Sequence, residues 1–249
     1  MEEARLETAR NIATNIAHEL RTPLTSIRQF ANGTQLHFQH LMETYQRATS
    51  IGLASGNLRP SQLETLTKIF GSIEKETVYS NMVIDMLLVR SGQKDASEFE
   101  WERFSTSEVV AEVMQRFPAN NALEKNLPQL FVHEDFQITG PRLLVVHAIV
   151  NLLKNAVYYS QRARSPRVEV HISVDPPRWG VVRLMDNGSG ISSESLKHLF
   201  HPFYTTTKAG EGTGIGLSFS QKVMHDLEGS IELVDSAPLP TCFEMRFPL

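Results

Sequence analysis

Two long stretches of helical periodicity fill the first 92 residues, and this pattern constrains the fold more than any other feature of the sequence. Residues 50–60 between them hold two glycines, an asparagine and a proline, which is typical of a loop. Ser61 and Glu64 then have the spacing of a capping box at the start of the second helix. The apolar or small positions of the first helix are Ile12, Ile16, Leu20, Leu24, Ile27, Ala31, Thr34, Phe38, Leu41, Tyr45 and Ala48.

A hairpin of two amphipathic helices cannot bury both of its apolar seams alone. Pairing with a second copy about a two-fold axis would close the seams into a four-helix bundle. The alternative is a bundle with the rest of the same chain, but the remaining residues carry too little helical pattern for it. We therefore predict that residues 1–92 form a dimerisation hairpin.

The rest of the chain alternates between strand-like and helix-like patterns. Residues 93–97 are polar and small and form the predicted linker, and residues 98–249 form the second domain. Overall this predicts an α+β protein whose C-terminal domain is a two-layer α/β sandwich with one sheet and one helical layer. We expect one strand at 98–104, two short strands within 131–139, and further strands at 167–175, 179–185, 230–234 and 242–248. We expect helices at 107–117, 141–159, 195–200 and 217–228.

Composition excludes several classes of protein. Lys and Arg number 24 against 28 Asp and Glu, a formal charge of −4, so we expect no nucleic-acid partner. A single cysteine, Cys242, excludes an intramolecular disulfide and a cysteine-based zinc cluster. We see no signal peptide and no apolar run of membrane-spanning length, so these residues are expected to be soluble and intracellular.

His18 is the first candidate for chemistry, because helical geometry points it away from the apolar seam. Glu19 is adjacent, Thr22 lies one turn further on the same face, and Pro23 should kink the helix. An exposed imidazole beside a carboxylate can act as a nucleophile, although an idle surface histidine is the commoner case. A zinc-protease site is excluded, because no second histidine stands at the fifth position of this segment.

Three further segments could bind a ligand, although each alone is a weak signal. Asp186 follows a predicted strand and precedes Gly188 and Gly190, so it is either a buried acceptor for an exocyclic amine or part of a simple turn. The glycine triplet at 212–216 opens a helix that could bind phosphate, without the features of a P-loop or a Rossmann fold. Asn151 and Asn155 share a helical face and could ligate a hard cation or bond to a loop.

The order and spacing of these segments are much more specific than any one of them. "IAHELRTPLTSI", "NLLKNAVYYS", "MDNGSGI", "LFHPFYTTTK" and "GEGTGIGLSFSQKVM" resemble the H, N, G1, F and G2 boxes of bacterial sensor histidine kinases of two-component systems. The resemblance runs from about residue 11 to residue 249 and implies a HisKA-type hairpin followed by a GHKL-type ATP-binding domain. The long hairpin and "VIDMLLV" also resemble quorum-sensing hybrid kinases that detect α-hydroxyketones.

This resemblance implies a role for each matching position. His18 would accept the phosphoryl group, Glu19 would orient it and assist proton removal, and Thr22 would help water remove phosphate from the receiver. Asn155 would coordinate Mg²⁺. The other expected ATP contacts are Asn151, Tyr159, Asp186, Gly188, Gly190, Phe203, Lys208, Gly212, Thr213, Gly214, Ile215, Gly216 and Leu217.

The family also implies partners and a location. We expect ATP and Mg²⁺ as ligands, a homodimer through residues 1–92, and a response-regulator receiver domain as the phosphate acceptor. We predict that the chain is the cytoplasmic portion of a larger inner-membrane receptor whose sensor lies upstream. The chain departs from the family at Tyr158, where Lys or Arg is usual, so one phosphate contact is missing or supplied by Lys208 or Arg162. A pseudokinase scaffold and a stand-alone ATPase are the alternatives.

Overall fold

A computed structural model describes residues 2–53, 60–90, 96–117, 124, 127–176, 178–207, 214–235 and 239–249. Within the two N-terminal helices it describes only the backbone at residues 2–19 and at several later positions. The chain divides into two compact units, Met1–Leu88 and Val89–Leu249.

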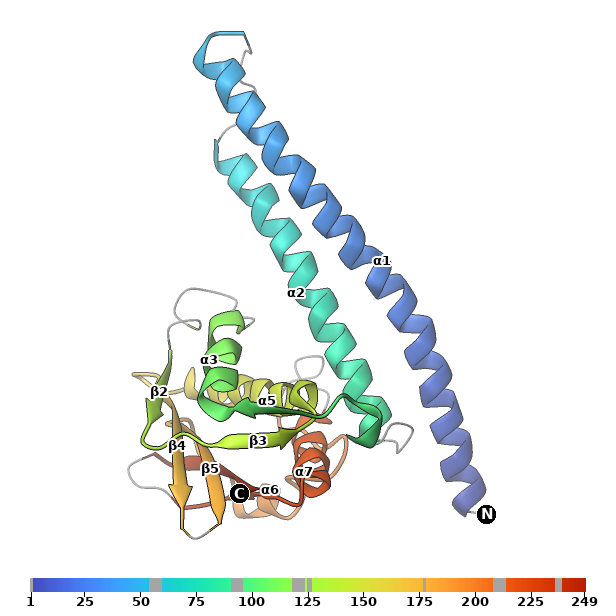
Figure 1. The fold of residues 1–249 in the computed structure, drawn as a ribbon, viewed down its shortest axis with the longest axis vertical. Coiled ribbons are helices and arrows are strands. Elements are labelled where there is room, and N and C mark those ends of the chain that lie inside the picture. Colours follow the sequence, from blue (N-terminus) through green and yellow to red (C-terminus); the bar gives the residue numbers. More distant parts are fainter. Residues whose placement is uncertain are drawn as a thin grey trace. The chain divides into compact units, whose positions relative to one another are not determined.

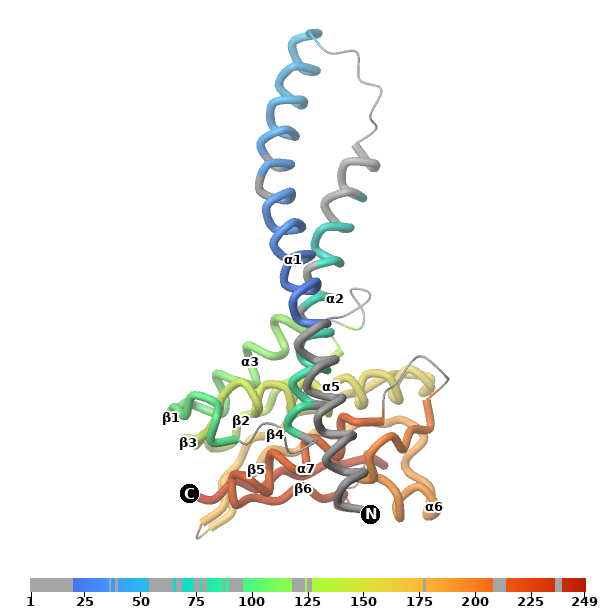
Figure 2. Tube along the Cα trace, turned by 90° about the vertical axis from the view of Figure 1, so that its right-hand side faces the viewer, coloured from blue at the N-terminus to red at the C-terminus, as the bar shows by residue number. Residues whose placement is uncertain are grey.

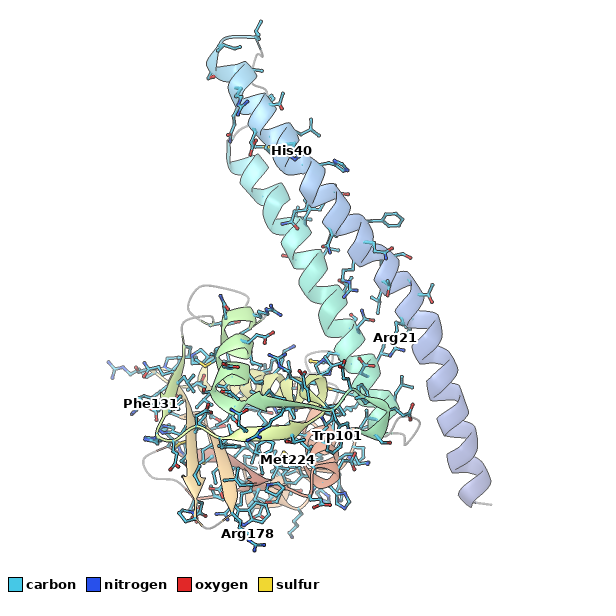
Figure 3. The ribbon with its side chains drawn as sticks, viewed as in Figure 1. Arg21, His40, Trp101, Phe131, Arg178 and Met224 are labelled. Atoms are coloured by element: carbon cyan, nitrogen blue, oxygen red, sulfur yellow. The ribbon has the colours of Figure 1, made fainter. Side chains whose placement is uncertain are left out.

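The first unit is a hairpin of two long helices, as the periodicity predicts. Helix α1 spans Glu2–Ser50 and α2 spans Pro60–Arg90, and the two lie side by side (Figures 1 and 2). Leu24 of α1 packs on Ile84 and Leu88 of α2. The two helices are also joined by polar and aromatic contacts: Arg21 donates to Asp85 at 2.8 Å (Figure 3), and the rings of Phe38 and Phe70 lie 5.7 Å apart.

One copy of the hairpin leaves part of the predicted seam uncovered. Leu20 and Ile27 are about half exposed, and Leu41 is 66% exposed. Because exposed apolar side chains in a row mark an interaction surface, a second copy remains our expected partner for this face. The four-helix bundle stays a prediction.

Gly33 lies inside α1, and a methyl group added there would meet no atom within 4 Å. We expect Gly33→Ala to stabilise the hairpin by about 1 kcal/mol, because alanine loses less backbone entropy than glycine on entering a helix. Urea unfolding followed by helical circular dichroism, at one fixed protein concentration, measures this. A loss of stability would contradict the prediction and indicate that another surface packs closely on Gly33.

The second unit contains a five-stranded mixed sheet in the order β2-β4-β5-β7-β6. Among the strand pairs that the structure describes in this sheet, β2 and β4 run parallel and the others run antiparallel. The strands are β2 (Pro128–Val132), β4 (Val168–Asp175), β5 (Trp179–Asp186), β6 (Ser230–Leu233) and β7 (Thr241–Pro248). The helical layer consists of α3 (Thr106–Arg116), α5 (Arg142–Ser160) and α7 (Gly216–Asp226) (Figure 1). The two-layer sandwich is therefore present.

Alternating side chains of β4 explain how the sheet and the helices share a core. Val168, Val170 and Ile172 are fully buried, while Glu169 and His171 point to the opposite face of the sheet. The largest buried side chains from the other elements are Leu144, Ile149, Leu152, Leu153, Leu184, Phe219, Met224, Met245 and Phe247.

Strands β1 (Glu102–Ser105) and β3 (Gln137–Gly140) pair only with each other, outside the sheet that we expected them to join. Asp135 accepts hydrogen bonds from the Ser105 hydroxyl at 2.6 Å and from the Ser107 amide at 2.9 Å. These bonds tie the start of α3 to the segment before β3, so β3 runs beside β1. The expected strand at 98–104 begins only at Glu102, because Ala96–Glu98 forms a 3-10 turn.

Two other sequence predictions need correction. The helix expected at 195–200 is a single turn, α6 (Ser193–Leu196), whose start is capped by Ser192. Among the described residues, α5 is long and apolar enough to cross a membrane by length and composition alone, although we expected no such segment. Over half of its most apolar window is buried inside the unit, because α5 is the core helix of the sandwich.

Candidate nucleotide site

Asp186 is a buried carboxylate at the end of β5. It accepts a hydrogen bond from the Gly188 amide at 2.8 Å and another from the side chain of Thr241, which lies opposite it in β7. Burial raises the pKa of Asp186 to about 6, while these two hydrogen bonds lower it. A carboxylate has about four lone-pair sites, so this group can accept a further bond from a ligand amine.

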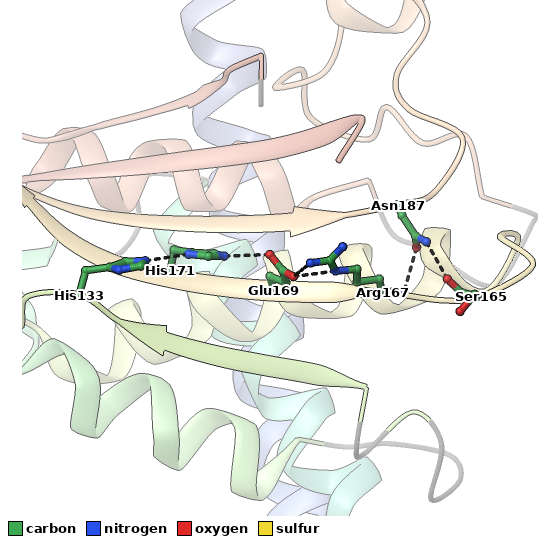
Figure 4. Close-up of polar contacts among 6 residues, drawn as sticks. All are labelled: His133, Ser165, Arg167, Glu169, His171 and Asn187. Carbon is green, nitrogen blue, oxygen red and sulfur yellow. Dashed lines mark hydrogen bonds and ion pairs between the residues drawn. The ribbon is translucent and has the colours of Figure 1, made fainter. Parts of the chain in front are cut away.

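Glycine is required in the turn after β5, because the backbone passes close to the end of α5. A Cβ at Gly188 would lie 2.8 Å from the carbonyl oxygen of Tyr159. Gly190 has φ +71°, a conformation that other residues rarely adopt. Asn187 holds the turn from its other side: its Oδ1 accepts from the Arg167 amide at 2.8 Å, and its Nδ2 donates to the Ser165 carbonyl at 2.7 Å (Figure 4).

Helices α5 and α7 meet at Asn151. Its Nδ2 donates to the Ser220 hydroxyl at 3.4 Å, and a Cβ at Gly216 would lie 1.8 Å from its Oδ1. Asn155 is half-buried one turn further along α5, on the same face. The first residue of α7 therefore has to be glycine for the helix to approach these amides so closely.

The start of α7 is free of a side-chain cap, since Ile215 occupies the N-cap position. The backbone amides of a first helical turn have no partner within the helix, and they favour an anion. The Asn151 side chain therefore lies at the start of α7, and Asn155 lies one turn further along the same face of α5. Carboxamide oxygens are ligands that suit a hard cation such as Mg²⁺, so the side chains of Asn151 and Asn155 have the chemistry to ligate one.

The segment after α6 is joined to both helices. Tyr159 of α5 shares a 2.7 Å hydrogen bond with the hydroxyl of Thr206. Phe203 is 71% exposed and has φ 65°, and its amide donates to the Gly214 carbonyl at 2.9 Å. The guanidinium of Arg162 lies over the rings of both Tyr158 and Tyr159, 5.6 and 5.3 Å from their centroids. Lys208, Gly212 and Thr213 lie outside the described residues.

The predicted phosphotransfer residues lie on α1. His18 and Glu19 are part of this helix, but their side chains are outside the described set. Thr22 is exposed, and α1 continues through Pro23. Two other histidines of α1, His37 and His40, are exposed (Figure 3 labels His40).

Two contacts of the site were not predicted from the sequence. Thr241 reaches Asp186 only because β5 and β7 pair in this register, and Ser220 reaches Asn151 only because α7 packs on α5. Thr241 lies outside the recognised motifs, and Ser220 lies within "GEGTGIGLSFSQKVM" at a position to which the motif assigns no role.

Comparisons with known proteins agree with this geometry. Residues 140–249 match the family model described as histidine kinase-, DNA gyrase B- and HSP90-like ATPase. The chain is 28% identical over 246 residues to the CAI-1 autoinducer sensor kinase/phosphatase CqsS of Vibrio cholerae, covering 99% of this chain and 34% of that protein. It is 27% identical over 231 residues to the sensor histidine kinase CusS of Escherichia coli K12, covering 91% and 43%.

Other relatives and solved structures also match over both units of the chain. The chain is 25% identical to the autoinducer 1 sensor kinase/phosphatase LuxN of Vibrio harveyi, covering 98% of this chain and 26% of that protein. It thus spans between a quarter and less than half of the length of these curated relatives. Full-length ShkA, solved in complex with AMPPNP, has a similar fold at 16% identity, with TM-score 0.59 over 96% of this chain and 45% of that one.

A histidine kinase AdeS from Acinetobacter baumannii has TM-score 0.52 at 19% identity, over 86% of this chain and 97% of that one. Residues 140–249 therefore match the ATPase family of the histidine kinase, gyrase and HSP90 type, and both units of the chain are similar to sensor histidine kinases.

Proposed function

We propose that this chain is an ATP-dependent protein-histidine kinase that phosphorylates its own His18 and then passes the phosphoryl group to an aspartate of a receiver domain. The observation that carries the proposal is Asp186, a buried carboxylate with room for a further hydrogen bond, held by Gly188 and Thr241. An adenine amine is a donor that such a site fits. The names of the relatives, which are sensor kinases, support the same activity.

Each group of site residues would contact a different part of ATP. Asp186, with Gly188 and Gly190 beside it, would accept from adenine, and Tyr159 would flank the base. Asn155 would coordinate Mg²⁺, which when bound neutralises charge on the phosphate oxygens, and Asn151 would line the same site. Lys208 and the amides of the α7 start would hold the phosphates, with Phe203 anchoring the segment that covers them. Arg162 is available beside Tyr158 to supply the contact that the family's basic residue makes.

The chemical step would be transfer of the γ-phosphoryl group of ATP to His18. One imidazole nitrogen of His18 would bond to the γ-phosphorus while the bond to the β,γ-bridging oxygen breaks and ADP leaves. The proton on the other imidazole nitrogen would pass to Glu19. The nitrogen–phosphorus bond would later break as a receiver carboxylate takes the phosphoryl group. Thr22 would position a water molecule that hydrolyses the receiver's aspartyl phosphate and releases inorganic phosphate, the phosphatase activity that the names of two relatives include.

We also propose an oligomeric state and a cellular location for this chain. Residues 1–92 would pair two copies, and the chain would be the cytoplasmic portion of an inner-membrane receptor with an upstream sensor. The relatives' lengths support this, because the chain spans about a third of CqsS. Two matched relatives are named as autoinducer sensors, which supports a quorum-sensing signal.

Transfer of label from γ-labelled ATP with Mg²⁺ tests the proposal directly. We expect an acid-labile, base-stable label on the parent chain, lost in both His18→Gln and Asn155→Ala. His37→Gln is the matched control, because it removes an exposed histidine from the same helix, and it should label normally. Label that persists in His18→Gln would assign the phosphate to another residue.

An unlabelled chain that still binds ATP would instead be a scaffold or a core held in its phosphatase state. Adding a phosphorylated receiver separates these two, since only the phosphatase state would release phosphate from it.

A further inference from the structure

Two histidines meet on the face of the sheet opposite the buried valines of β4, at a place that the proposed function does not use. His133 directly follows the edge strand β2, and His171 lies in β4. The Nε2 atom of His133 is 3.0 Å from the Nδ1 atom of His171 (Figure 4). His133 is exposed and His171 is 23% exposed, so solvent can reach the pair.

The ring of His171 is held in place from two sides. The Phe131 ring stacks on it with centroids 4.7 Å apart and an angle of 17° between the planes. Glu169 accepts a hydrogen bond from His171 Nε2 at 2.9 Å, and the same carboxylate accepts from Arg167 Nε at 2.7 Å. Glu169 is thus the carboxylate of an ion pair with Arg167, and it also holds the ring of His171 in place.

This hydrogen bonding assigns the tautomer of His171. The Glu169 carboxylate accepts, so Nε2 of His171 carries a hydrogen, and in the neutral form of the ring Nδ1 keeps a lone pair. Nε2 of His133 then donates to that lone pair. A histidine whose second ring nitrogen donates to a carboxylate is the usual arrangement for a metal ligand.

We propose that His133 and His171 form a binding site for a divalent transition metal ion of the Zn²⁺, Cu²⁺ and Ni²⁺ class. A metal–imidazole bond is about 2.0–2.1 Å long, so two such nitrogens around one ion lie about 2.9–3.4 Å apart. The observed 3.0 Å falls in that range, and a rotation of the exposed His133 ring, which now meets His171 at 15° between the ring planes, would aim both nitrogens at one ion. Binding requires the hydrogen on His133 Nε2 to move to Nδ1 of the same exposed ring, so no net proton has to leave the pair.

The arginines near the His133–His171 pair are paired with carboxylates, so their positive charge would not exclude a metal cation. His171 lies in register opposite Arg183, whose Nε donates to Glu244 at 2.7 Å. Glu244 also accepts from Arg246, which in turn contacts Asp175 at 3.1 Å. Each arginine named here is thus paired with a carboxylate. Within the described residues no group of three or more His, Cys, Asp and Glu side chains is arranged for a metal, so water would complete the coordination.

The second close histidine pair of this unit lacks these features. The Nδ1 atoms of His198 and His201 are 3.3 Å apart, but in the described part of the chain neither ring contacts a carboxylate, and both are exposed. Their rings meet edge to face at 67°, with no partner comparable to Glu169. This pair therefore provides a matched control.

Calorimetric titration of the untagged full chain with ZnCl₂, without nucleotide, tests the site. We expect one micromolar site that Mg²⁺ does not compete for, because imidazole suits Zn²⁺, Cu²⁺ and Ni²⁺ and Mg²⁺ prefers oxygen ligands. His133→Gln and His171→Gln should each abolish it, and Glu169→Gln should weaken it about 10- to 100-fold, as loss of an outer-shell partner does. His198→Gln should bind Zn²⁺ as the parent does.

Three outcomes would overturn the proposal: no Zn²⁺ binding, unchanged binding in His133→Gln, or loss of binding in His198→Gln instead. His133 lies at an exposed strand end, so its variant reports on binding even if His171→Gln folds poorly. A nitrogen shift at His171 Nδ1 on adding Zn²⁺, measured by NMR, gives an independent readout. The test is separate from kinase activity, because none of these residues belongs to the proposed ATP site.

Discussion

Replacing Asp186 with asparagine is expected to weaken nucleotide binding roughly 10- to 100-fold, in line with the 1.5–3 kcal/mol of a hydrogen bond to a charged group. The same change should stabilise the second unit near neutral pH. The carboxylate is 3% exposed, and burial raises its pKa from 3.8 to about 6. Each pKa unit corresponds to about 1.4 kcal/mol, so the ionised group costs on the order of 3 kcal/mol in the folded state.

The stability gain of Asp186→Asn should depend on pH, and the raised pKa of Asp186 decides the direction of that dependence. Between pH 4 and 6 the folded chain holds a proton at Asp186 that the unfolded chain has lost, so the parent loses stability as pH rises through this window. Asparagine does not titrate. The stability advantage of Asp186→Asn should therefore be small near pH 4 and complete above about pH 6–7.

Urea unfolding of parent and variant at a series of pH values, with nucleotide binding by calorimetry, measures both effects. Asp175→Asn is the matched control, since Asp175 is a half-exposed carboxylate of β4 that contacts Arg246. It should leave nucleotide binding unchanged and should not stabilise the unit. An Asp186→Asn chain that binds nucleotide as the parent does would refute the assignment of this carboxylate.

Replacing Gly214 with alanine is expected to disrupt the start of α7 and nucleotide binding together. Gly214 has φ +66°, and a Cβ there would lie 2.5 Å from the backbone carbon of Phe203. The left-handed conformation alone costs a non-glycine residue about 1–2 kcal/mol, and backbone atoms cannot move aside as a side chain can. We expect the unit to lose about 2–4 kcal/mol of stability, the scale of strain at special backbone positions.

Nucleotide affinity should fall by about tenfold or more, because the Phe203–Gly214 backbone bond places the segment before α7, and tenfold is about 1.4 kcal/mol. Thermal unfolding and calorimetry measure the two effects. Gly33→Ala is the matched control, because the same substitution in open space should stabilise. Parent-like stability of Gly214→Ala would show that this contact relaxes without cost.

The sequence by itself determined the class of each unit, because periodicity is a local property. The 3.6-residue spacing from Ile12 to Ala48 and the alternation of Val168, Val170 and Ile172 are readable without a structure, and α1 and β4 occur where they predict. The motifs likewise make Asp186 and the α7 start candidate nucleotide-binding positions, because each motif is a short local segment of the sequence.

Only the tertiary structure decided which distant residues meet. Strand pairing sets Thr241 opposite Asp186, packing of α7 brings Ser220 to Asn151, and the parallel pairing of β2 with β4 brings His133 to His171. The separate β1–β3 pair also depends on long-range bonds to Asp135. Such contacts depend on sheet order and register, which single residues and local spacing do not encode.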